Sequence, residues 1–113
     1  MTGDGLYVEA ALDAAVILSI RSNVQLTDDD LEAVRAVALM YQPRTTGKLA
    51  RALGMSRSSG DFRKILERLQ KAGVFEVYRN GRLDFSLHHY ALRWRRLEEL
   101  RAMRTSAFNP TLV

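Results

Sequence analysis

The sequence predicts a single, mainly α-helical domain that carries one β-hairpin. Several segments repeat apolar residues at helical spacing, capping residues and glycines mark their ends, and Asn80-Gly81 separates two short strand-like segments. The 113 residues amount to one domain and contain no Gly/Ser-rich or Pro-rich linker and no internal repeat. We therefore treat residues 1–113 as one domain.

The first predicted helix, residues 6–21, is rich in Ala, Leu and Ile. Its acidic residues Glu9 and Asp13 are four positions apart and share one narrow strip, so the rest of its circumference is apolar. Such a helix requires cover on more than one side. The β-branched pair Val16-Ile17 leaves the start of a strand as the alternative.

The second predicted helix, residues 28–41, follows a capping signal. Thr27 and Asp30 resemble a capping box in which Asp replaces Glu, and the acidic residues from Asp28 on suit the positive end of a helix dipole. Pro43 ends the helix. Apolar residues at steps of three and four positions form one face, namely Leu31, Val34, Ala38 and Tyr41.

A short third helix, residues 46–53, is expected next. Either Thr45 or Thr46 caps it, and Gly54 supplies the left-handed residue after its end. Its inner face consists of Leu49, Ala50 and Leu53.

The fourth predicted helix covers residues 58–72. Ser58 caps it, Asp61 completes the capping box, and Gly73 follows its end. Its apolar stripe consists of Phe62, Ile65, Leu66 and Leu69.

A hairpin is predicted over residues 74–87, because Asn80-Gly81 between two strand-like segments favours a type I′ turn. A fifth helix is expected over residues 89–104, followed by a loose tail over residues 105–113.

This order of elements is that of a winged helix-turn-helix. Residues 49–56 match the pattern LA..LG.S, residues 65–75 match L..L...G, and the stretch over residues 28–88 resembles bacterial winged-helix regulators of the MarR-like type. The resemblance implies a mainly α fold with a β-hairpin wing, here with additional N- and C-terminal helices. It also implies a transcriptional regulator that binds double-stranded DNA in a sequence-specific manner as a homodimer.

The charges are unevenly distributed along the chain. Residues 1–42 carry two basic and seven acidic side chains, whereas residues 43–113 carry fifteen basic and six acidic ones. Such a basic segment is typical of a protein that binds a polyanion. A solvated basic surface is the alternative, and charge alone does not decide between them.

The predicted DNA-binding residues follow from the helix-turn-helix geometry. The face of helix 58–72 opposite its apolar stripe is expected to meet the bases, with Arg63 or Lys64 donating to guanine, and Glu67 either accepting from cytosine or pairing with a neighbouring lysine. The start of this helix suits a phosphate, and two arginines flank the hairpin tip. The full predicted set is Lys48, Arg57, Ser58, Ser59, Gly60, Arg63, Lys64, Glu67, Arg68, Arg79, Asn80 and Arg82.

Other function classes find little support. The chain has no cysteine, which excludes disulfides and thiolate ligands, and the adjacent His88 and His89 lack a third ligand, so we expect no metal and no cofactor. No recognisable catalytic set is present, and we expect no enzyme activity. The apolar run over residues 6–20 is too short to span a bilayer, so we expect a soluble cytoplasmic protein without a membrane partner.

The terminal helices are expected to form the homodimer, through residues 6–26 and 89–104. Val8, Leu12 and Leu18 are placed on the side of the first helix that faces away from the core, and Leu92 and Met103 on the surplus face of the last helix. In the competing arrangement the two helices cover each other within a monomer. The alternative function is a winged-helix module that binds another protein, as an accessory subunit of a replication or transcription complex or an antitoxin-like partner.

Overall fold

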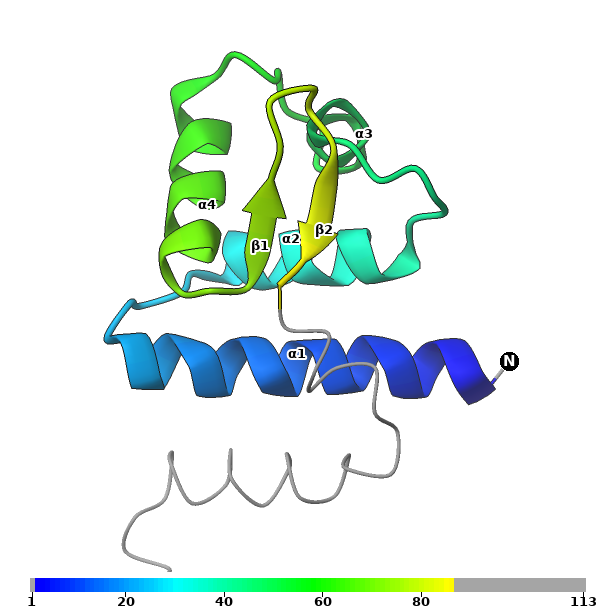
Figure 1. Cartoon of the computed structure of the whole chain (residues 1–113), viewed down its shortest axis with the longest axis vertical. Helices are drawn as coiled ribbons and strands as arrows, with labels where there is room; N and C mark the ends of the chain where they lie inside the picture. The colour runs from blue at the N-terminus through cyan, green and yellow to red at the C-terminus, as the bar shows by residue number, and fades with distance from the viewer. Residues whose placement is uncertain (1, 87–113) are drawn as a thin grey trace, which may run out of the picture.

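The computed structural model describes residues 2–86 of the chain, and within them it is mainly helical. Four helices precede a two-stranded antiparallel hairpin, an arrangement compatible with a winged helix (Figure 1). The elements are α1 (Thr2–Ser22), α2 (Asp28–Leu39), α3 (Thr46–Ala52), α4 (Gly60–Lys71), β1 (Phe75–Val77) and β2 (Leu83–Phe85). The predicted helix over residues 89–104 and the tail over residues 105–113 lie outside the described residues.

Helix α1 lies alongside α2 with opposite direction, and the short link over residues 23–27 joins them (Figure 1). It begins at Thr2, four residues earlier than predicted, and it is helical through Val16-Ile17, so the strand alternative is wrong there. Helix α2 ends at Leu39, two residues earlier than predicted.

The core lies where α2, α3, α4 and the hairpin meet. Its fully buried large side chains include Val34, Val37, Leu49, Phe62, Ile65, Leu69, Val74 and Leu83. The apolar faces predicted for helices 46–53 and 58–72 supply half of them, Leu49, Phe62, Ile65 and Leu69, which confirms the helical spacing as the guide to the buried side.

The prediction for the free side of α1 is wrong. Val8 is buried in the same core cluster, and Leu12 and Leu18 are partly buried against it. The sequence does not define this side, because α1 is apolar nearly all round and its spacing marks no single inner face. The other two predicted dimer residues, Leu92 and Met103, lie outside the described residues.

The capping residues are close to those predicted. The Thr27 hydroxyl accepts the Asp30 N–H and the Asp30 carboxylate accepts the Thr27 N–H, so the capping box with Asp is confirmed. Thr45 caps α3 by accepting the Lys48 N–H. Ser59, rather than Ser58, caps α4, because its hydroxyl is the one that reaches a helical N–H, that of Phe62.

The hairpin is confirmed, but its turn differs from the predicted type I′. Tyr78 N–H donates to the Arg82 carbonyl and Gly81 N–H donates to the Tyr78 carbonyl. Only Gly81 of the Asn80-Gly81 pair has positive φ, at 85°. This is the pattern of a three-residue loop, a type I turn followed by a left-handed residue.

Residues 44–46 extend the hairpin on the β2 side. Thr45 pairs with Arg82 in an antiparallel bridge, Leu83 N–H donates to the Arg44 carbonyl, and Thr46 N–H donates to the Gly81 carbonyl. These bonds fix the hairpin tip against the start of α3. No described helix combines the length and apolar character needed to cross a membrane.

Candidate nucleic-acid interface

The solvent face of α4 is strongly polar because its apolar residues all point inward. Phe62, Ile65 and Leu69 are buried in the core. Six other side chains of α4 are exposed, namely Asp61, Arg63, Lys64, Glu67, Gln70 and Lys71. A helix with one face on its own core and the other in solvent has the geometry that groove binding requires.

Three segments that carry predicted contacts lie at one end of the molecule. In Figure 1 the start of α4, the loop between α3 and α4, and the hairpin tip all lie at the end of the longest axis opposite α1. Arg57 and Ser58 belong to the loop, Gly60 begins α4, and Arg79 and Asn80 belong to the tip.

The loop and the tip both lie near the start of α3, where the Thr46 N–H donates to the Gly81 carbonyl of the tip at 2.8 Å. A Cβ added at Gly47 would lie 3.9 Å from Arg57 Nη1, and one added at Gly81 would lie 3.6 Å from Thr46 Oγ1. Lys48 is exposed in the first turn of α3, where its Nζ donates to the Pro43 carbonyl at 2.7 Å. The structure therefore brings the loop, the tip and Lys48 together around the first turn of α3.

Most of the cations in this region have no acidic partner. Within the described residues, Arg57, Arg63, Lys64 and Arg79 are exposed and take part in no ion pair. Glu67 is exposed as well and pairs with neither Lys64 nor Lys71, so the pairing alternative for Glu67 is not seen. A cation without an acidic partner can bind a phosphate without first breaking an existing ion pair.

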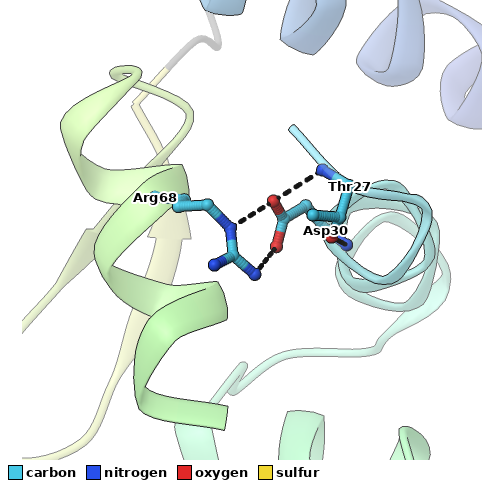
Figure 2. Close-up of polar contacts among 3 residues, drawn as sticks. All are labelled: Thr27, Asp30 and Arg68. Atoms are coloured by element: carbon cyan, nitrogen blue, oxygen red, sulfur yellow. Dashed lines mark hydrogen bonds and ion pairs between the residues drawn. The ribbon is translucent and has the colours of Figure 1, made fainter. Parts of the chain in front are cut away.

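Arg68 does not belong to this surface, which corrects its predicted placement. Its Nε and Nη2 donate to the two carboxylate oxygens of Asp30 at 2.7 and 3.0 Å (Figure 2). Asp30 is 0% exposed, and one of its oxygens also accepts the Thr27 N–H at 2.9 Å. The hydrogen bonds to Asp30 raise the pKa of Arg68, so the guanidinium stays charged and bound.

Sequence reasoning missed this pair for an identifiable reason. Helix capping already explained Asp30, and nothing in the local pattern links it to a residue 38 positions away. The available signal was Arg68 itself, which lies between the buried Ile65 and Leu69 of α4 and so close to the edge of the apolar stripe.

A second surface feature lies between α2 and α3, on elements other than α4 and the hairpin. A shallow groove there is lined by Ala36, Leu39, Met40, Ala52 and Leu53, with Glu32, Arg35 and Lys48 among its polar residues. Leu39 is 58% exposed, and the nearby Tyr41 is 88% exposed. Exposed apolar side chains beside a groove are typical of a protein-binding surface.

The chain matches no protein-family model, no curated protein and no solved structure. The resemblance to MarR-like regulators therefore remains an interpretation of the residue pattern. Among the described residues no group of three potential ligands could hold a metal ion, and His88 and His89 lie outside them.

We expect the Asp30–Arg68 pair to stabilise the packing of α4 against α2. Arg68→Ala leaves a buried carboxylate with only a backbone N–H as partner, and breaking a buried pair in this way costs about 3–5 kcal/mol. We expect a loss of about 3 kcal/mol, the low end, because the Arg68 side chain is 31% exposed. The measurement is the free energy of unfolding in urea.

The control for this prediction is Arg63→Ala, an exposed site on the same helix, where a change within about 0.5 kcal/mol is expected. The double variant Asp30→Asn with Arg68→Met removes both charges and should recover part of the loss, because no unpaired carboxylate remains. A loss for Arg68→Ala no larger than that for Arg63→Ala would contradict the account.

Proposed function

We propose that this protein is a winged helix-turn-helix protein that binds double-stranded DNA in a sequence-specific manner. The observation that carries the proposal is the group of exposed, unpaired cations on α4, on the loop before it and at the hairpin tip. The order α2, residues 44–46, α3, α4 and hairpin supports a winged helix, since it supplies helix, short strand, helix, helix and wing in that order.

In this proposal α4 enters the major groove with its exposed face toward the bases. Arg63 and Lys64, one turn into the helix, donate to guanine O6 and N7, and Glu67 accepts from cytosine N4. Gly60, where a Cβ would meet no atom within 4 Å, leaves open space for a phosphate at the start of α4. The exposed Asp61 opposes phosphate there, so Ser58 and Arg57 in the preceding loop carry most of the backbone contact.

Regulation of transcription is the use of such binding that the resemblance to MarR-like regulators favours. The described residues form a helical scaffold that presents one charged end, and the proposed activity requires neither cofactor nor catalysis.

We further propose that the protein acts as a homodimer, since dimeric helix-turn-helix proteins place two recognition helices about 34 Å apart on successive turns of DNA. Val8 cannot supply that interface without leaving the core, and Leu12 and Leu18 are partly buried against the core. Ile20 is the exposed apolar residue of α1 within residues 8–22 and is the better choice for a test.

The second candidate function is binding to another protein through the groove between α2 and α3. Leu39 and Tyr41 favour this function, because covering two large exposed side chains beside an apolar groove would remove apolar surface from water. The exposed Lys48 and Arg35 beside the groove suit a partner helix with apolar anchors and acidic flanks.

The first prediction concerns DNA binding. Duplexes selected by the protein from a random pool should share a motif, and affinity for them should fall with salt by about 0.9 in log K per log salt for each phosphate contacted. Arg63→Ala or Lys64→Ala should reduce the preference for the selected duplex over a shuffled one by about fivefold or more, since a bidentate base contact contributes about 1–3 kcal/mol. Fluorescence anisotropy against both duplexes measures this.

The matched control is Arg35→Ala, an exposed arginine on α2 whose removal should leave both affinities unchanged. If the wild-type protein binds no duplex even at low salt, DNA binding is excluded and the protein-binding function replaces it.

The second prediction concerns the homodimer. Sedimentation equilibrium at micromolar concentration should give twice the mass of one chain, and Ile20→Asp should shift the protein toward the monomer while its circular dichroism spectrum stays the same, since this side chain already contacts solvent. A single-chain mass at every concentration for the wild type would rule the dimer out.

A further inference from the structure

The outer face of the hairpin carries an unfavourable arrangement of charge. Glu76 of β1 lies directly opposite Asp84 of β2 in the antiparallel register, and both side chains point to the face away from the buried Phe75 and Phe85. Like charges directly opposite each other on one face of a sheet destabilise it. A cation on this face would offset the repulsion between the two carboxylates.

Arg82 supplies that cation. Its Nη2 lies 3.1 Å from Asp84 Oδ2, and its guanidinium lies 5.6 Å from the centre of the Tyr78 ring on the opposite strand. Desolvation and the neighbouring Glu76 carboxylate raise the pKa of Tyr78. Asp84 is 24% exposed, so it would lose its partner in a mostly buried setting if Arg82 moved to a phosphate.

The backbone of Arg82 is held as well. It bridges to Thr45, its N–H donates to Asn80 Oδ1 at 3.0 Å, and its carbonyl accepts the Tyr78 N–H at 2.8 Å. Arg79, three residues earlier, has an exposed side chain and no ion pair within the described residues. Before any ligand binds, Arg82 is therefore held in an ion pair with Asp84, whereas Arg79 has no ion pair within the described residues.

We propose that Arg79 alone is the phosphate contact of the hairpin and that Arg82 is a positioning residue, which pairs with the Asp84 carboxylate and holds the tip against the start of α3. This assignment rests on the proposed DNA binding. It limits the approach of DNA to the tip of the hairpin, because the carboxylates further along its outer face repel phosphate.

The test is the salt dependence of affinity for the selected duplex, measured for Arg79→Ala and Arg82→Ala. Arg79→Ala should reduce the slope of log K against log salt by about 0.9 and leave the melting temperature unchanged, since one phosphate contact is lost. Arg82→Ala should lower the melting temperature and weaken binding while the slope stays that of the wild type.

A double variant, Arg82→Ala with Asp84→Asn, separates positioning from contact. It removes one carboxylate of the unfavourable pair, so the melting temperature and the affinity should return toward those of the wild type with an unchanged slope. It also keeps the test decisive if Arg82→Ala alone does not fold.

Three outcomes count against the proposal. A slope reduced by about 0.9 in the double variant would show that Arg82 contacts phosphate and would overturn the assignment. An unchanged slope for Arg79→Ala would overturn it equally. A wild-type protein that binds no duplex would instead overturn the proposed function, and the assignment with it.

Discussion

The carboxylate of Asp30 is the interaction on which the arrangement of α4 depends. It accepts the Thr27 N–H at the start of α2 and both donors of the Arg68 guanidinium, while its own side chain is fully buried (Figure 2). A buried carboxylate is costly unless its oxygens are bound, and here each oxygen has a donor. One residue therefore ties the link after α1, the first turn of α2 and the middle of α4 together.

The bidentate geometry matters as much as the charge. Two parallel hydrogen bonds to a planar guanidinium fix direction as well as distance, so α4 has little freedom to rotate about its axis relative to α2. With that rotation fixed, Arg63 and Lys64 stay on the solvent side. The hydrogen bonds between residues 44–46 and the hairpin fix the position of the hairpin tip in the same way. Both α4 and the tip are thus held in place by contacts within the domain.

Much of the fold was predictable because its signals are local. Thr27 with Asp30 marked the start of α2, the spacing of Phe62, Ile65 and Leu69 marked the inner face of α4, and Asn80-Gly81 marked the hairpin. The exact turn was not predictable, because Asn-Gly is compatible with both the two-residue loop and the observed three-residue one.

The failures involve contacts between distant residues. The apolar circumference of α1 could not show which side meets the core, so Val8 was assigned to the wrong one. Arg68 was counted with the exposed cations because its partner Asp30 is contributed by α2, 38 positions away in the sequence. A sequence shows which side chains are charged, but only the tertiary contacts show which of them are free to bind a ligand.

The central claim is that the end of the molecule formed by the start of α4, the loop before it and the hairpin tip meets DNA. The most direct measurement is the change in backbone amide NMR shifts when a short duplex is added to the labelled protein. The account predicts changes concentrated at Arg57, Gly60, Lys64 and Arg79, with the amides of Leu39 and Tyr41 unaffected. Changes confined to the groove between α2 and α3, or none at the start of α4, would contradict it.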